Sequence, residues 1–291
     1  MPVVALMASC STYPSPNSRG PTDRLLVDLP DMASDRMLEL VGQAGGPLAD
    51  ASLWHLEVVD TGPLSPTMRR VVLTAPGLEG LRYVAGQDLM LRVPRADGKV
   101  TNRRYTIRSF NAAPPAVTID VSLHGAGPGT DWIRAARVGD RIDAIGPRGK
   151  ITPQLSADWH LFIGDETGMP GAQAMIEALP AEATATALFE VDTPADEQEP
   201  EARHAPRLHL RFAYRSGRSA PGEVSLLEEA LADIALPVGR GHVYVAAETG
   251  VVRRIQRVLA ERGLAQDQIS AKAYWRRGLP NAEHGEPARP D

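Results

Sequence analysis

The sequence predicts an antiparallel β-barrel of six strands followed by a doubly wound α/β domain with a parallel sheet. Short strand patterns separated by Gly, Pro, Asn and Asp fill its first half, whereas strands alternate with helices in its second half. The chain has 291 residues, of which 43% are hydrophobic, so it can build two cores. We expect four segments, which are residues 1–50 (a largely flexible N-terminal extension), 51–155 (the barrel), 156–280 (the α/β domain) and 281–291 (a C-terminal tail).

Composition narrows the possible functions. The formal net charge of −5 argues against a general nucleic-acid binder, which needs a basic surface. Cys10 is the only cysteine, which excludes an intrachain disulfide, a Cys-ligated zinc site and a four-cysteine iron–sulfur cluster, and we expect no metal site. No run of about 18 apolar residues is present, so we expect a cytoplasmic protein without a membrane span. Redox chemistry would have to come from a bound cofactor.

The barrel is predicted from six short strand patterns, each bounded by turn residues. Residues 130–137 instead have helical spacing, with Trp132, Ile133 and Ala136 as the apolar positions. Six short strands and one helix indicate a small antiparallel barrel. The expected strands are residues 53–60, 67–76, 87–94, 103–110, 116–125 and 141–147.

The α/β domain is predicted from the alternation of strands and helices, which makes a doubly wound sheet. Helix ends are marked by Pro170 in a first turn, by a capping box of Ser225 and Glu228, and by Gly263, at which the last helix ends. A G-x-G-x-x-G fingerprint is absent, so a nicotinamide would dock transiently at the carboxyl ends of the strands. We expect strands at 159–164, 185–191, 208–214, 242–247 and 271–275, and helices at 168–179, 225–234 and 250–263.

The strand around Arg103 carries the most informative motif. Arg103-x-Tyr105-Thr106 presents a cation, an aromatic ring and a hydroxyl in an order that can bind a flavin. The arginine can neutralise a pyrophosphate, the ring can pack on the isoalloxazine or ribityl chain, and the hydroxyl can hydrogen-bond the N5 edge. The alternative is an exposed strand with alternating charge.

A second candidate site runs from Asp120 to Thr130, with the sequence DVSLHGAGPGT. A strand leads into a Gly-rich turn and a helix N-terminus, where backbone amides and the helix dipole favour an anion. Gly127, Gly129 and Thr130 would bind the flavin diphosphate, and His124 would end the strand close to the flavin. The alternative for His124 is a turn histidine bonded to the backbone.

Two acidic turns end strands of the α/β domain, GDETG at residues 164–168 and AAETG at 246–250. Thr167 would face the flavin across the domain cleft, and an electron donor could approach the second turn. The carboxylates could instead only cap the following helices. Arg215 and Arg218 could meet the 2′-phosphate of NADPH or could equally be loop charges.

The C-terminal segment KAYWRRG places Trp275 between Tyr274 and the pair Arg276–Arg277. An exposed tryptophan beside arginines fits the wall of an open pocket for an anionic ligand. A basic edge strand, protected from pairing by its charges, is the alternative.

Taken in order, these motifs resemble those of the siderophore-interacting proteins, which are FAD-dependent ferric-siderophore reductases of the ferredoxin-reductase superfamily. The resemblance spans about residues 53–278. The motifs that carry it are RRYTIR, DVSLHGAGPGTDW, GDRIDAIGPRG, HLFIGDETGMP, HVYVAAETGVVR and KAYWRRG.

The resemblance implies a role for each candidate residue. Tyr105 and Thr106 would be catalytic, at the flavin. Basic residues beside the flavin would attract the anionic iron complex, and we expect Arg92, Lys272, Trp275 and Arg277 to bind the substrate. The cofactor-binding residues implied are Arg103, Arg104, Tyr105, Thr106, Asp120, Val121, Ser122, Leu123, His124, Gly127, Gly129, Thr130 and Thr167.

We therefore expect an FAD-dependent reductase that passes electrons from NAD(P)H through the flavin to the Fe(III) of a siderophore. The barrel would bind FAD, and the α/β domain would be NAD(P)H-binding-like. The resemblance also allows ferredoxin as the donor. The alternatives are a general flavin reductase or electron-transfer flavoprotein, and a flavin-free siderophore-binding module.

Overall fold

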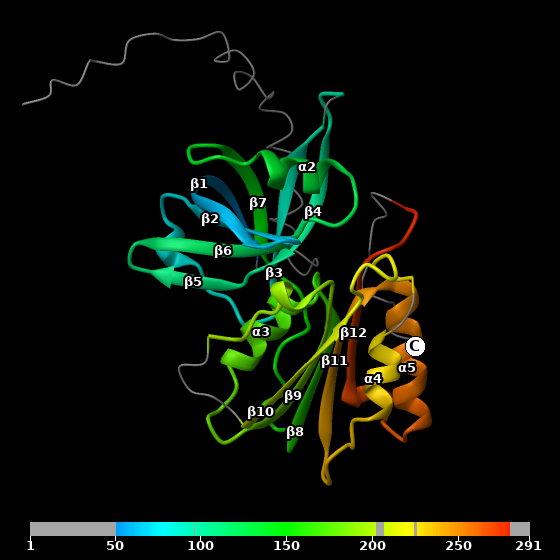
Figure 1. Ribbon diagram of the computed structural model, residues 1–291. Helices are drawn as coiled ribbons and strands as arrows, with labels where there is room; N and C mark the ends of the chain where they lie inside the picture. The colour runs from blue at the N-terminus through cyan, green and yellow to red at the C-terminus, as the bar shows by residue number, and fades with distance from the viewer. Residues whose placement is uncertain (1–50, 96, 202–206, 224–225, 280–291) are drawn as a thin grey trace, which may run out of the picture.

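The computed structural model describes residues 51–95, 97–201, 207–223 and 226–279. The predicted flexible extension, the C-terminal tail and the capping residue Ser225 lie outside these residues. Within them the chain forms two sheets, a seven-stranded antiparallel sheet above and a five-stranded parallel sheet below in Figure 1. The fold is thus the predicted combination of a barrel-like half and a doubly wound half.

The antiparallel sheet has the strand order β4-β3-β7-β1-β2-β6-β5, and it curls like a barrel while β4 and β5 remain its edges. A core of inward-facing aliphatic side chains fills it, among them Leu56, Leu91 and Ile119. The helix α2 (Pro128–Ala135) connects β6 to β7. The strands are β1 (Ser52–Ser65), β2 (Met68–Thr74), β3 (Asp88–Pro94), β4 (Val100–Thr106), β5 (Ser109–Ala112), β6 (Pro115–Ser122) and β7 (Arg141–Arg148).

The number of strands corrects the prediction of six. The expected strand over 103–110 is divided into β4, which pairs with β3, and β5, which pairs with β6. Between them the Ile107 amide donates to the Gln87 carbonyl at 2.9 Å, and the Arg108 amide donates to the Thr118 carbonyl at 2.9 Å. The chain thus changes partner at this corner of the barrel, which an uninterrupted strand pattern in the sequence cannot show.

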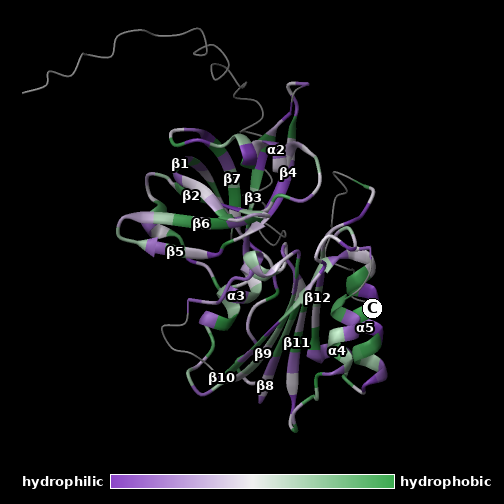
Figure 2. Ribbon diagram, viewed as in Figure 1, coloured by the Kyte–Doolittle hydropathy of each residue, from purple (hydrophilic) through white to green (hydrophobic). Residues whose placement is uncertain are grey.

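The parallel sheet has the order β10-β9-β8-β11-β12, and all its ladders are parallel. The helix α3 (Met169–Glu177) lies on one face, while α4 (Leu226–Ala232) and α5 (Thr249–Glu261) lie on the other (Figure 1). Buried hydrophobic residues of the strands and helices form clusters between these layers, as the doubly wound prediction requires. Figure 2 shows hydrophobic stretches along these strands and helices. The strands are β8 (Trp159–Asp165), β9 (Thr184–Val191), β10 (Arg207–Tyr214), β11 (Gly241–Glu248) and β12 (Ile269–Trp275).

Polar contacts join the two halves. Asp196, which is 1% exposed, accepts hydrogen bonds from the backbone amide and the hydroxyl of Thr67 at 3.0 and 2.8 Å. Arg108 forms a bidentate ion pair with Glu177 at 2.7–2.8 Å. Both contacts link the antiparallel sheet to segments of the α/β half, so they hold the two walls of the intervening space. The boundary at residue 155, between β7 and β8, stays a prediction.

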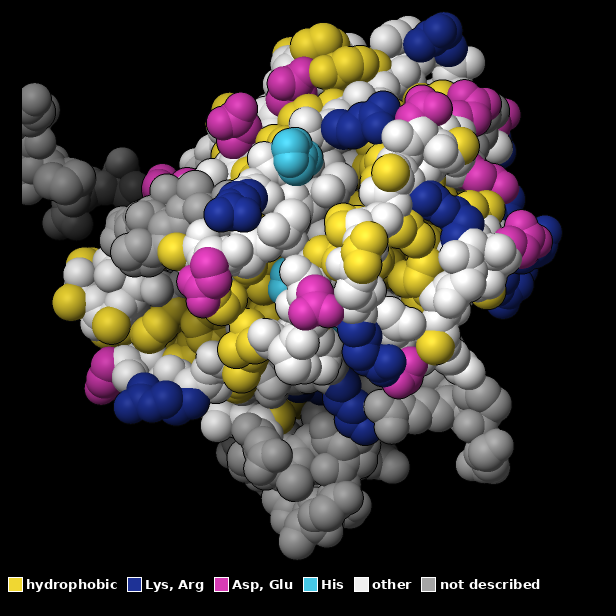
Figure 3. Space-filling model, turned by 90° about the horizontal axis from the view of Figure 1, so that it is seen from below, with side chains coloured by type: hydrophobic (Ala, Val, Ile, Leu, Met, Phe, Trp, Pro, Cys, Tyr) yellow, Lys and Arg dark blue, Asp and Glu magenta, His cyan; other side chains and the backbone are white. Residues whose placement is uncertain are grey.

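The surface seen in Figure 3 carries both basic and acidic side chains. None of the helices in the described ranges has both the length and the apolarity needed to cross a membrane. The described residues also contain no cluster of three or more His, Cys, Asp or Glu that could hold a metal ion.

Candidate functional site

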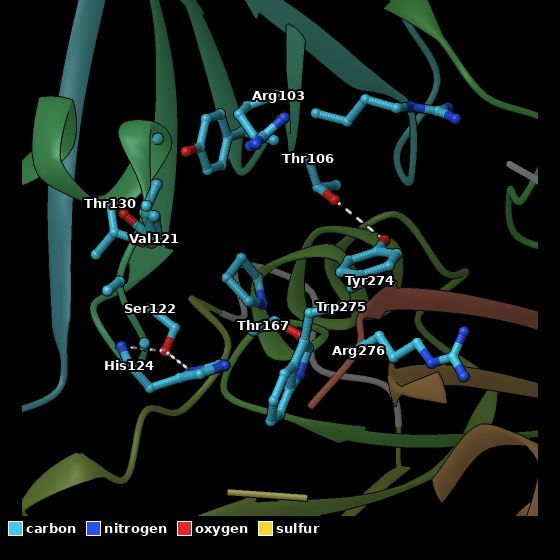
Figure 4. A pocket seen from close by; sticks show the side chains of 18 of the residues that line it. Arg103, Thr106, Val121, Ser122, His124, Thr130, Thr167, Tyr274, Trp275 and Arg276 are labelled. Atoms are coloured by element: carbon cyan, nitrogen blue, oxygen red, sulfur yellow. Dashed lines mark hydrogen bonds between the residues drawn. The ribbon is translucent and has the colours of Figure 1, made fainter. Parts of the chain in front are cut away.

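A pocket of about 390 Å³ lies between the two sheets. Its walls come from β4, the end of β6, the turn into α2, the start of α3 and the end of β12 (Figure 4). All the residues predicted to bind the cofactor line this pocket except Leu123. Leu123 packs instead against the barrel core, since its side chain points inward after β6 ends.

Strand alternation on β4 divides the RRYT motif between two sides. Arg103 and Tyr105 both approach α2, where a Cβ on Gly129 would stand 3.0 Å from Arg103 Cγ and 2.5 Å from Tyr105 Oη. Arg104 points the other way and forms an ion pair with Asp88 at 2.7 Å. Burial raises the pKa of Tyr105 well above its usual value, so the phenol stays neutral.

The Gly-rich turn brings α2 against these side chains. Gly125 and Gly127 have positive φ angles of 80° and 146°, which residues with a Cβ rarely adopt. Pro128 then starts the helix, and no side chain of the N-cap residue accepts a hydrogen bond from its first turn. Gly129 is required for the close approach to Tyr105. The N-terminus of α2 therefore lies beside Arg103, and its N-cap residue provides no side-chain cap.

This cradle fits the pyrophosphate of FAD. An anion is stabilised where helix amides point at it and a guanidinium lies nearby. The other two helices that begin at the cleft each have a carboxylate bonded to backbone amides at or just before their start. Asp165 accepts hydrogen bonds from the Thr167 and Gly168 amides before α3, at 2.9 and 3.3 Å, and Glu248 caps α5 through the amides of Gly250 and Val251.

Glu248 therefore caps α5, which was the simpler interpretation of its carboxylate, whereas Asp165 bonds amides that precede α3, whose N-cap residue Gly168 makes no side-chain cap hydrogen bond. Thr167 itself lines the pocket, and its hydroxyl donates to Asp165 at 2.5 Å. Asp165 also accepts a hydrogen bond from Trp275 Nε1 at 2.8 Å, so this turn helps to orient the indole.

Asp120 reaches the pocket wall, but its carboxylate is already occupied. Arg70 Nε and Nη2 donate to its two oxygens at 2.7 Å each, and the Asp120 side chain is fully buried. Two residues further along β6, the Ser122 hydroxyl lies 2.6 Å from Nδ1 of His124. Side-chain and backbone atoms of β6 thus form one rigid wall.

His124 faces Trp275 across the pocket. Their ring centroids are 4.4 Å apart at an interplanar angle of 56°, and Figure 4 shows the two side chains approaching from opposite halves. Burial lowers the pKa of His124, which favours the neutral imidazole. His124 is therefore a wall residue bonded to the Ser122 side chain, rather than a turn histidine bonded only to backbone.

The structure separates the predicted substrate-binding residues. Trp275 lines the pocket, whereas Arg92, Lys272 and Arg277 are not among its lining residues. Each of these cations is instead paired with a carboxylate from a distant part of the sequence. Arg92 pairs with Asp143 at 3.2 Å, Lys272 with buried Asp88 at 2.9 Å, and Arg277 with Glu223 at 3.1 Å.

Two functional candidates were missed as site residues. Tyr274 and Arg276 line the pocket, and Arg276 is exposed at its edge. Tyr274, Trp275 and Arg276 are consecutive and all line the pocket, because the register of β12 is irregular at its end and Arg276 follows the strand. Arg277, one residue further, does not line the pocket.

The turn after β10 settles one open alternative. Arg215 is 3% exposed and pairs with both Glu166 and Glu190, so its guanidinium is not available to a 2′-phosphate. Burial raises the pKa of Glu190 to about 7. Arg218 is exposed, and Nη2 donates to the Tyr214 carbonyl at 3.4 Å rather than to a carboxylate.

Comparison with known proteins gives the family. A model described as siderophore-interacting protein matches residues 157–278, and one described as siderophore-interacting FAD-binding domain matches residues 86–151. An uncharacterized protein of Mycobacterium tuberculosis is 34% identical over 267 residues, covering 79% of this chain and 93% of that one. Ferric vibriobactin reductase ViuB of Vibrio cholerae is 31% identical over 186 residues, covering 62% and 66%.

Solved structures agree with this assignment. A siderophore utilization protein from T. fusca is 35% identical, with a TM-score of 0.72, and the match covers 80% of this chain and 96% of that one. The ferredoxin reductase of carbazole 1,9a-dioxygenase, at 19% identity and a TM-score of 0.58, shares the fold alone and covers 77% and 66%. The chain therefore belongs to the siderophore-interacting protein family, with its FAD-binding domain over residues 86–151.

Proposed function

We propose that the protein is an FAD-dependent reductase of ferric siderophores that takes electrons from NAD(P)H and releases Fe(II). One observation carries the proposal. The RRYT strand, the helix N-terminus of α2 and the Trp275–Arg276 wall all open onto the same pocket. A flavin cradle and a cationic aromatic wall are thus in one space.

The residues of the barrel half would hold the cofactor. The amides of Gly129 and Thr130 and the guanidinium of Arg103 would bind the pyrophosphate. Tyr105 would pack on the flavin, and the Thr106 hydroxyl would meet its N5 edge. Bound FAD would supply the ability to accept two electrons together and to release them singly. The neutral state of Tyr105 suits an apolar stacking role.

Arg276 and Trp275 would receive the iron complex. Arg276 is exposed beside the pocket, and no ion pair within the described ranges engages its guanidinium. A cation in this state can attract an anionic siderophore without first breaking a pair. No protein ligand to iron is needed, because the siderophore itself holds Fe(III). The Vibrio relative is named for the reduction of a ferric siderophore, which supports this substrate class.

The electron donor would approach the carboxyl ends of β8 and β11, where ligands bind doubly wound sheets. Arg218 is an exposed cation in the turn after β10, the edge strand of the same sheet. Ferredoxin remains the alternative donor. The cytoplasmic location stays a prediction.

A single assay tests the proposal. Purified protein is mixed with NADPH or NADH, a ferric siderophore and a ferrous-specific chelator, and the coloured Fe(II) complex is followed. We expect flavin absorbance in the protein and chelator colour that depends on the nicotinamide. Flavin reduction without iron release would indicate a general flavin reductase, and a colourless protein that rejects added FAD would indicate a binding module.

Substitution of Arg276 tests the substrate site. Arg276→Ala should raise the KM for an anionic ferric siderophore about fivefold, as expected for the loss of a charged contact of about 1 kcal/mol, with unchanged FAD content. The matched control is Arg277→Ala, which removes the neighbouring cation that is paired with Glu223. Equal effects of the two substitutions would contradict the assignment of Arg276.

A further inference from the structure

Tyr274 connects the last strand of the parallel sheet to the barrel side of the pocket. Its hydroxyl oxygen lies 3.2 Å from Oγ1 of Thr106, and Figure 4 shows the two side chains facing each other from β12 and β4. Thr106 is only 8% exposed. A Cβ on Gly171 would lie 3.1 Å from Thr106 Cγ2 and 3.5 Å from Tyr274 Oη, so α3 packs closely against both. The heavy atoms are therefore held in place, while the hydroxyl hydrogens can rotate.

The two hydroxyls can form their hydrogen bond in either direction, because each has one hydrogen and can also accept. When Tyr274 donates to Thr106, the Thr106 hydrogen is available to the pocket. When Thr106 donates to Tyr274, Thr106 presents a lone pair to the pocket. Lys272 Nζ lies 5.3 Å from the centre of the Tyr274 ring and is anchored by Asp88, so a fixed cation also holds this ring.

We infer that Tyr274 is a positioning residue that lets the Thr106 hydroxyl serve both redox states of the bound flavin. The inference rests on the proposed function, in which Thr106 meets the N5 edge. N5 accepts a hydrogen bond in oxidised flavin and carries a hydrogen in reduced flavin, so a partner of fixed polarity suits only one state. With Tyr274 present, the Thr106 hydrogen has an acceptor whenever it turns away from the pocket.

Removal of the Tyr274 hydroxyl should therefore affect reduced FAD most. In Tyr274→Phe the Thr106 hydrogen can still reach oxidised FAD, but it has no acceptor when reduced FAD occupies the site. A buried donor without a partner costs about as much as a lost hydrogen bond, so reduced FAD should bind about fivefold more weakly relative to oxidised FAD. For a two-electron couple this lowers the midpoint potential of the bound flavin by ~20 mV.

The experiment is a redox titration of FAD bound to the full-length protein. Tyr274→Phe keeps the ring against Lys272, and melting of the FAD-free protein checks that the variant folds. In a Thr106→Val background, adding Tyr274→Phe should cause no further shift of the midpoint potential, because the Thr106 hydroxyl is absent. In a Thr106→Ser background, Tyr274→Phe should cause the same shift as in the wild type. The matched control is Tyr214→Phe. Tyr214 lies on β10, the opposite edge strand of the same sheet, and the substitution removes a hydroxyl that donates to Glu197.

Two results would overturn the inference while leaving the proposed function intact. One is an unchanged midpoint potential in Tyr274→Phe. The other is an equal shift in the Thr106→Val background, which would mean that Tyr274 acts by another route. If the wild-type protein itself binds no FAD, the proposed function fails, and the role of Tyr274 fails with it.

Discussion

A pair of buried histidines should make the protein sensitive to mild acid. His242 on β11 and His160 on β8 are register partners, and they are 7% and 3% exposed. Burial lowers the pKa of His242 to about 4. The neighbouring His160 and Arg240 lower this pKa further, whereas Asp267 raises it. Its ring is held by Ser270, whose hydroxyl oxygen lies 2.9 Å from Nε2. The folded protein therefore keeps His242 neutral.

The sign and size of the effect follow from proton binding. An unfolded histidine has a pKa of about 6.5, so below that pH the unfolded chain takes up a proton that the folded chain rejects. The contribution of neutral His242 to the unfolding free energy is fully present above about pH 7, and it is lost as the pH falls toward 4. With a folded pKa of about 4, the loss from His242 between pH 7 and pH 5 is about 2 kcal/mol.

Urea unfolding at pH 7 and pH 5 measures this loss. The change in unfolding free energy between the two pH values should be about 2 kcal/mol smaller in His242→Gln than in the wild type. The control is His209→Gln, which alters an exposed histidine on β10 and should keep the wild-type pH dependence. Carboxylates contribute equally to all three proteins and cancel in the comparison. The reasoning is refuted if His242→Gln and the wild type lose the same stability.

Two further predictions concern the cradle and the contact between the halves. Gly129→Ala should weaken FAD binding at least tenfold, since its Cβ would stand 2.5 Å from Tyr105 Oη. FAD titration measures this affinity. The control is Gly80→Ala, where no heavy atom lies within 4 Å of the added Cβ. Equal affinities in the two variants would show that α2 does not need its close approach. Arg108→Met should lower the unfolding free energy by about 3 kcal/mol, because it leaves the Glu177 carboxylate without its cationic partner. Urea unfolding tests this, and adding Glu177→Gln should restore part of the loss; no restoration would contradict the ion-pair explanation.

The sequence by itself determined the fold class and most residues of the proposed cofactor pocket. The RRYT motif and the DVSLHGAGPGT turn are each continuous segments, so the residues of each motif can be identified from the local pattern, although the two segments meet only in the folded chain. Alternation of short strands, and then of strands with helices, was enough to predict the two kinds of sheet. Local periodicity and local turn chemistry were therefore sufficient to identify the two kinds of sheet and the residues of the two motifs.

Only the tertiary structure decided which cations face the pocket. Arg92, Lys272 and Arg277 are paired with Asp143, Asp88 and Glu223, which lie far away in the sequence. The charge of such a residue can be read from the sequence, but its partner depends on how the sheets are placed. The division of the strand at Ile107 has the same origin, because a change of strand partner is a long-range event. The contact of Tyr274 with Thr106, across 168 positions of the chain, likewise exists only once the two halves have packed together.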